Sequence, residues 1–132
     1  MKSAPKIGEQ FERRFIVGEQ HLITFADEQM PAVLATPWLI AEMEYTARDS
    51  VAHLLEEHER TVGTAVDIRH LAPSLLEFEV TCTSRVIGYE DGEITFQVEA
   101  FDRVDLLARG VHRRRVVDTN RLRRRVSRKR EA

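Results

Sequence analysis

The sequence has little cysteine and no long apolar run. Cys82 is the only cysteine among 132 residues, so no internal disulfide can form. The longest apolar stretch is far too short to cross a membrane. No apolar stretch follows residues 1–5, as a secretory signal peptide would require. From these features together we expect a cytoplasmic protein that does not associate with a membrane.

Motifs for several common chemistries are also missing. The six glycines form no phosphate-binding loop, and no serine lies in a nucleophile elbow. There is no zinc-binding set of cysteines, and no two of the five histidines have convincing metal-ligand spacing with a supporting acid. We therefore predict a protein with no metal and no cofactor of its own.

The charge is distributed unevenly along the chain. The net charge is −2, but the segment from His112 to the end holds ten Lys or Arg against Asp118 and Glu131, which leaves −10 for residues 1–111. A cationic tail suits an anionic ligand, such as nucleic acid or a phosphorylated cofactor, or an acidic face of the same protein. The alternative is a solvated terminal helix. Because no aromatic residues alternate with the arginines, we predict that no nucleic acid is bound.

Length and periodicity predict a single α+β domain spanning residues 1–132. We expect one strand, a long lid loop, one helix that begins at Thr36-Pro37 and ends near His58 or Glu59, and then an antiparallel meander. The expected boundaries are strand 9–17, lid loop 18–35, strands 62–71, 75–87, 93–101 and 106–117, and a basic C-terminal helix at 119–130 capped by Asp118-Thr119. Because the long helix cannot bury its apolar face alone, we expect a curved sheet wrapped around it, which is the hotdog arrangement.

Two polar residues interrupt the apolar pattern. Glu44 lies about 40° from Ile40 on the helical wheel, inside the apolar stripe, whereas Glu42, Asp49 and Glu56 are expected to be surface acids. His70 ends the 62–71 strand on the face that we expect to cover the helix. Each has a structural alternative, since Glu44 could reach solvent or an arginine at the edge of the stripe. If both meet at the helix–sheet interface, they form an acid–base pair.

Thr36 is a third candidate. Threonine is a good N-cap residue, which is its structural role whatever else it does. A helix N-terminus also supplies free N–H groups and partial positive charge to a developing oxyanion.

The chain resembles the hotdog thioesterase superfamily, and within it the fluoroacetyl-CoA thioesterase family. The similarity runs from residue 7 to about residue 126, and it is sharpest at 33–36 (VLAT), 43–45 (MEY) and 63–66 (GTAV) leading to His70. The segment 110–112 with Arg114 or Arg115 is also similar. The resemblance implies an acyl-CoA thioesterase in which Thr36, Glu44 and His70 are catalytic. Glu44 then acts as a nucleophile or as a base on water, and CoA is part of the substrate rather than a cofactor. The substrate-binding residues implied are Gly63, Thr64, Met30, Phe25 and Arg114.

One segment departs from the family. The fluoroacetate enzyme has a lid with phenylalanines just before the helix, but residues 27–31 here (DEQMP) are polar apart from Met30, and Phe25 is out of step. We therefore expect hydrolysis of a short or medium acyl-CoA to a carboxylic acid and CoA, without specificity for fluoroacetyl-CoA. The alternative is a non-catalytic acyl-CoA or acyl-carrier binding protein of the same fold. Because a lone unit exposes sheet edges, we expect a homodimer joined edge to edge.

Overall fold

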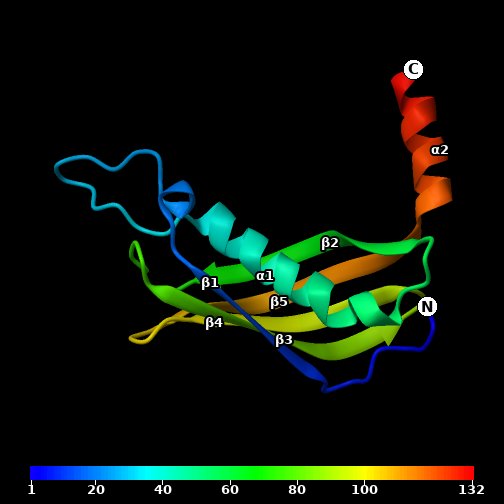
Figure 1. Ribbon diagram of the computed structural model, residues 1–132, viewed down its shortest axis with the longest axis horizontal. Coiled ribbons are helices and arrows are strands. Elements are labelled where there is room, and N and C mark those ends of the chain that lie inside the picture. The colour runs from blue at the N-terminus through cyan, green and yellow to red at the C-terminus, as the bar shows by residue number, and fades with distance from the viewer.

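A five-stranded antiparallel sheet curves around one long helix (Figure 1). The computed structural model describes residues 1–132. The strands are β1 (Gln10–Ile16), β2 (Glu59–His70), β3 (Glu79–Glu90), β4 (Glu93–Phe101) and β5 (Leu106–Asp118), and the helices are α1 (Thr36–Val51) and α2 (Thr119–Arg130). The order across the sheet is β1-β3-β4-β5-β2. The predicted α+β hotdog architecture is confirmed.

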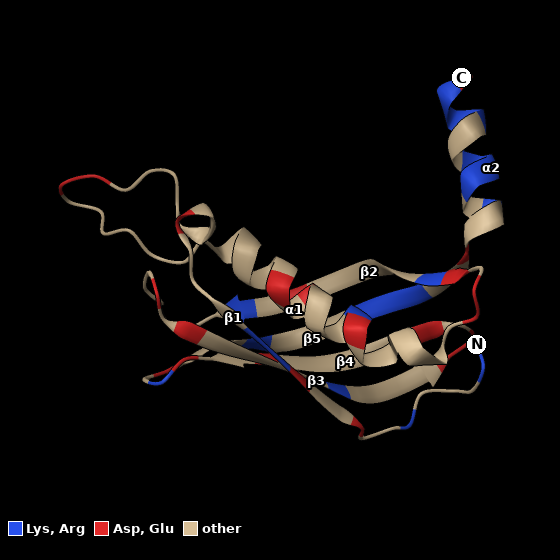
Figure 2. Cartoon of the chain, viewed as in Figure 1, with Lys and Arg blue, Asp and Glu red and all other residues tan.

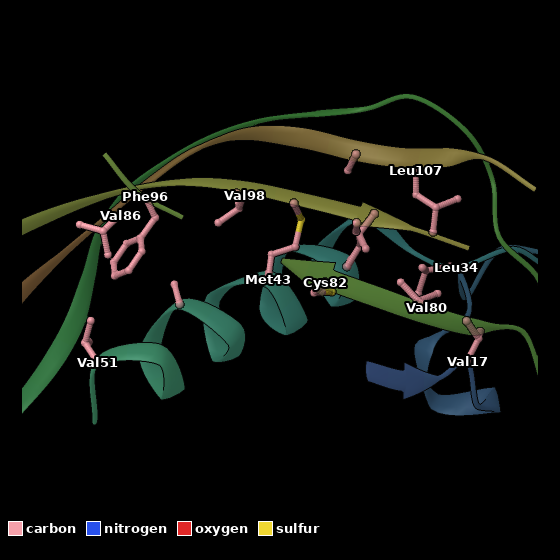
Figure 3. Close-up of a cluster of buried hydrophobic side chains, with 14 of the residues drawn as sticks. Val17, Leu34, Met43, Val51, Val80, Cys82, Val86, Phe96, Val98 and Leu107 are labelled. Atoms are coloured by element: carbon pink, nitrogen blue, oxygen red, sulfur yellow. The ribbon is translucent and has the colours of Figure 1, made fainter. Parts of the chain in front are cut away.

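The core lies between α1 and the concave face of the sheet (Figure 3). Leu39, Met43, Ala47 and Val51 form the buried stripe of α1, at the spacing that places residues on one helical face. The inward-facing residues of β4 are all buried, as the alternation predicts. The opposing sheet residues are Val80, Cys82, Val86, Ile94, Phe96, Val98, Ala100, Leu107 and Ala108.

The hairpin between β3 and β4 is tighter than expected. β4 has the predicted bounds, but β3 runs on to Glu90, and only Asp91 and Gly92 form the turn. Both turn residues have positive φ, 48° and 82°, the conformation that a two-residue hairpin requires. Gly88, expected in the connection, instead lies beside a bulge within the strand. At the other end, β3 begins at Glu79 rather than residue 75, because Glu77 has a φ of 70° that interrupts extended structure.

The end of α1 was predicted wrongly. The helix ends at Val51, where ψ is near 0°, and a 3-10 turn (Ala52–Leu54) follows, instead of continuing to His58 or Glu59. The amino terminus occupies the space beyond: Lys2 donates a backbone hydrogen bond to the carbonyl of Leu54, and the Met1 amino group pairs with Glu59 at 2.8 Å. Apolar periodicity alone cannot show that the chain must turn there to start β2.

The position of β2 also differs from the expectation. It is an edge strand, paired only with β5, and Thr61 is its one buried residue. A bulge between Gly63 and Ala65 shifts the alternation, so that Val66 is 41% exposed instead of covering α1. Ile68 and His70 remain half-buried near the end of the strand.

The C-terminal helix has the predicted bounds and cap. The Asp118 carboxylate accepts hydrogen bonds from the backbone N–H groups of Asn120 and Arg121, which also lowers its pKa. Figure 2 shows α2 as a strongly basic helix that stands clear of the sheet. No helix in the chain is long and apolar enough to cross a membrane.

Candidate active site

Thr36 and His70 form a direct pair at the amino-terminal end of α1. The hydroxyl of Thr36 lies 2.7 Å from Nδ1 of His70, which is the last residue of β2. Ala35, not Thr36, occupies the N-cap position, so the predicted capping role of Thr36 is wrong. The other ring nitrogen of His70, Nε2, is buried without a hydrogen-bond partner. Buried polar atoms are nearly always paired, so this imidazole nitrogen beside the Thr36 hydroxyl has unused hydrogen-bonding capacity.

Glu44 lies farther along α1 with its carboxylate only partly enclosed. Its side chain is 35% exposed, so it sits at the edge of the apolar stripe and not inside it. The buried acid of α1 is Glu42, at 10%, which had been expected on the surface. Both shifts follow from the helix orientation: the buried stripe passes through Leu39 and Met43, which turns Glu42 toward β1 and leaves Glu44 facing β2 and β5. No hydrogen bond joins Glu44 to Thr36 or His70.

A buried arginine holds the Glu44 carboxylate. Nη1 of Arg114, on β5, lies 3.5 Å from Oε2 of Glu44. The rest of the guanidinium group is fixed by Thr61, whose hydroxyl and carbonyl oxygens each accept a 2.9 Å hydrogen bond. Burial lowers the pKa of Arg114 from its ordinary value, and the negative charge of Glu44 acts in the opposite direction. Arg114 therefore contacts the Glu44 carboxylate on its buried side.

His112 completes this network, although it is not among the residues predicted to be catalytic. Nδ1 donates to the carbonyl of Ala65 at 2.9 Å, and Nε2 accepts from Arg114 Nη1 at 3.2 Å. The pKa of His112 is lowered, first by burial, and the adjacent cation of Arg114 adds to this. A neutral imidazole with its proton on Nδ1 is consistent with both contacts. The signal available from sequence was the alternation that places His112 and Arg114 on the same face of one strand.

Gly63 leaves the space that this arrangement needs. A Cβ atom there would lie 3.0 Å from Oε2 of Glu44 and 3.2 Å from Cε1 of His112. The glycine therefore lets β2 pass close to the carboxylate. Thr64, the adjacent bulge residue, is exposed and donates its hydroxyl to the carbonyl of Arg113.

A hollow beside Thr36 lies at the base of the lid. It has a volume of about 320 Å³, and its lining is mostly apolar. Phe25 lines it together with Thr36, but Met30 does not. Both lid residues are partly exposed. The hollow is lined by Leu22, Ile23, Thr24, Phe25, Ala35, Thr36, Pro37 and Trp38.

The foot of the lid is tied to α1 by a second polar cluster. Arg13 of β1 forms an ion pair with Glu42, and Nε2 of His21 lies 3.9 Å from the same carboxylate. Nδ1 of His21 accepts the backbone N–H of Gly18 at 2.8 Å, and its ring meets Trp38 edge to face. His21 belongs to the predicted lid loop of residues 18–35, but it is buried, and no feature of the sequence pairs it with Glu42. Across the whole chain, no three His, Cys, Asp or Glu side chains are grouped so that they could hold a metal ion.

Comparison with known proteins identifies the family of this chain. The fluoroacetyl-CoA thioesterase of Streptantibioticus cattleyicolor is 31% identical over 123 residues, covering 89% of this chain and 88% of that one. A solved point mutant of the fluoroacetyl-CoA-specific thioesterase, in complex with fluoroacetate and CoA, superimposes with a TM-score of 0.83 at 27% identity, covering 89% of this chain and 99% of the other. A thioesterase superfamily member from Thermus thermophilus gives 0.88 at 27% identity, covering 99% and 96%. The family model for fluoroacetyl-CoA-specific thioesterases matches residues 4–120, and the chain belongs to this family.

Proposed function

We propose that this thioester hydrolase acts on a short- or medium-chain acyl-CoA, with Glu44 as the group that attacks the carbonyl or activates water. The observation that carries the proposal is the half-exposed carboxylate of Glu44, which contacts the buried Arg114 and lies close to the backbone of Gly63. An ionised Glu44 is needed for both routes. The products are a carboxylic acid and CoA: water supplies the hydroxyl group of the acid, the C–S bond breaks, and the sulfur takes up a proton.

Thr36 and His70 serve at the acyl end of the substrate in this proposal. Their hydrogen bond fixes the ring, and Nε2 of His70 is buried with no partner in the protein. The hollow of about 320 Å³ next to Thr36 offers apolar walls for the acyl group, with Phe25 among them. Gly63 contributes its backbone to the substrate site, and Arg114 with His112 positions Glu44. The predicted binding of substrate by Arg114 stays part of the proposal.

Replacement of Glu44 tests the assignment most directly. Glu44→Gln keeps the shape of the side chain and removes its charge, so kcat should fall by about 10²–10⁴-fold against the best substrate of an acyl-CoA panel. Glu56→Gln is a matched control on an exposed acid. A folded Glu44→Gln protein that hydrolyses at the wild-type rate would contradict the mechanism and favour the second candidate, a non-catalytic acyl-CoA or acyl-carrier binding protein.

The polar lid supports the proposal that the enzyme is not specific for fluoroacetyl-CoA. At its tip the Asp27 carboxylate accepts the backbone N–H groups of Gln29 and Met30, so the segment 27–30 is a tight polar turn. We expect no large preference for fluoroacetyl-CoA over acetyl-CoA. Comparison of kcat/KM for the two substrates checks this, and a preference of several orders of magnitude would refute it.

A homodimer joined through β2 is the proposed assembly. The outer edge of β2 has no strand partner, and Val62 and Val66 are 38% and 41% exposed on it. An unprotected edge with apolar side chains favours strand pairing with a second copy. Val66→Lys should shift light scattering at micromolar concentration toward a monomer, whereas Val104→Lys, in the turn after β4, should not. A wild-type monomer would overturn the assembly.

The cytoplasmic location remains a prediction. It is supported by Cys82, whose free thiol is buried in the core and needs no oxidising compartment. Cell fractionation with activity measured in each fraction would test it.

A further inference from the structure

A basic groove lies where α2 leaves the end of β5. It has a volume of about 560 Å³. Arg121, Arg124, Arg125 and Arg128 all line it, and their spacing of three, four and seven residues places them on one face of the helix. Leu122, Val116, Val117 and Asp118 complete the lining. The groove therefore offers four guanidinium groups next to an apolar wall.

None of these four arginines has a carboxylate partner in the chain. Asp118, three residues before Arg121, is engaged as the cap of α2, and no ion pair joins any of the four arginines to an acid, Glu131 included. Like charges at this spacing repel one another on a helix. A cluster of unneutralised arginines beside a hollow is suited to a ligand that carries several phosphate groups, because guanidinium groups match phosphate oxygens in pairs.

The groove is far from the Thr36–His70 end of the same chain. In the register of β2 and β5, Asp118 lies opposite Glu59 at the start of β2, whereas Ala108 lies opposite His70 at the far end of β2. The eleven residue steps from Glu59 to His70 correspond to about 36 Å of extended strand. In Figure 1, α2 extends beyond the β2 edge of the sheet, and its twelve residues make it about 18 Å long.

If the β2 edges of two protomers pair across a two-fold axis, the groove of one protomer comes close to the Thr36–His70 end of the other. Strands related by such an axis run antiparallel, so the start of β2 in one protomer lies near the end of β2 in its partner. Neighbouring strands are about 4.8 Å apart. With full overlap, the start of α2 lies roughly two strand spacings, about 10 Å, from His70 of the partner protomer. The groove that is remote in one chain is then close to the other chain's acyl hollow.

From these observations we infer that α2 binds the phosphate groups of acyl-CoA for the active site of the partner protomer. CoA carries a diphosphate and a 3′-phosphate, which supply the several anions that four arginines would neutralise. The inference rests on the dimer and the substrate class in the proposed function. It assigns the arginine-rich C-terminus a role in substrate binding across the dimer, and it assigns no role in the chemical step.

Matched double variants test the groove. Arg124→Gln with Arg128→Gln removes two charges from its lining, and Arg123→Gln with Arg130→Gln removes two from the opposite side of the helix. The first pair should raise KM for acyl-CoA, and the Kd for free CoA in calorimetry, by ~3- to 10-fold at low salt, as expected for two partly exposed ion pairs. kcat should not change, and the effect should fade near physiological salt, where screening acts over about 8 Å. Equal CoA affinity in both double variants would overturn the groove, whether or not the protein hydrolyses thioesters.

Mixed dimers test the action across the interface. A Glu44→Gln subunit with an intact α2 is paired, through two affinity tags, with an Arg124→Gln/Arg128→Gln subunit that keeps Glu44. The only working site then lies in the subunit with the weakened groove. A wild-type KM is expected, because the partner supplies the arginines, and a KM as high as that of the Arg124→Gln/Arg128→Gln homodimer would refute the inference. Tight binding of a single-stranded RNA, lost in the same double variant while CoA affinity is unchanged, would also overturn it.

Discussion

Replacing Gly63 with alanine separates the positioning of Glu44 from the stability of the fold. The added Cβ would lie 3.0 Å from the Glu44 carboxylate and 3.2 Å from the His112 ring, so these neighbours must move by a few tenths of an ångström. The carboxylate is the more mobile of the two, because it is partly exposed and held on one side by Arg114. A displacement of 1 Å costs about 10²-fold in rate, so this smaller shift should lower kcat by roughly 4- to 10-fold.

The folded state should tolerate the same change. Gly63 does not need a left-handed conformation, and alanine in a strand gains about 0.5–1 kcal/mol relative to glycine. That gain offsets the cost of the close contacts, so Tm should stay within about 4 °C of the wild-type value. The measurements are thiol release from the best acyl-CoA and a thermal melt of the same sample.

Two other glycines provide the controls. At Gly88 a Cβ would meet Thr95 at an ordinary 3.5 Å, so Gly88→Ala should leave the rate unchanged and, with no close contact to offset the gain from alanine, raise Tm by about 2–4 °C. At Gly110 it would lie 2.0 Å from the carbonyl oxygen of Asp67, so Gly110→Ala should destabilise the β2–β5 pair by about 1–3 kcal/mol or more. A well-folded Gly63→Ala protein with wild-type kcat would show that the placement of Glu44 against β2 does not matter for catalysis.

Three further predictions concern individual side chains. Burial lowers the pKa of His112, so as the pH falls the imidazole is protonated in the unfolded protein before it is protonated in the folded protein. The free energy of unfolding should therefore decrease as the pH drops below about 6.5. The variant His112→Asn should show a weaker dependence of unfolding free energy on pH in chemical denaturation at about pH 5–7. Burial raises the pKa of the Cys82 thiol to about 12, so a disulfide reagent at pH 8 should label it only in denaturant, and rapid labelling of the native protein would contradict the core position. Thr36→Ala removes the hydrogen bond to His70 and no helix cap, so it should lower kcat with less than ~1 kcal/mol loss of stability, and Thr36→Ser should restore the rate.

Periodicity predicted the parts of the fold whose structure depends on local pattern. The alternation of β4 and the basic helix after Asp118 were assigned with their observed bounds, because each is fixed by neighbouring residues. The end of α1 was not, because it depends on Lys2 and Met1 approaching from the other end of the chain.

The sequence allowed individual residues of the candidate site to be predicted, but not the contacts among them. Thr36 and His70 were singled out, and the structure places them in contact. No hydrogen bond joins Glu44 to His70, and Glu44 instead shares the guanidinium group of Arg114 with His112. The helical wheel also placed Glu44 inside the stripe and Glu42 outside it, because it gives angles without the direction from which the sheet approaches.

The polar cluster at the foot of the lid divides the loop into a fixed part and a variable part. Leu22 and Leu34 form a β-bridge, and the neighbouring His21 is anchored through Glu42 to Arg13. Residues 23–33 therefore begin and end at points that are held independently of their own sequence. In the proposed mechanism, exchange of this segment alone should change the acyl preference and leave α1 and Glu44 unchanged, so the lid is a suitable unit for grafting between relatives.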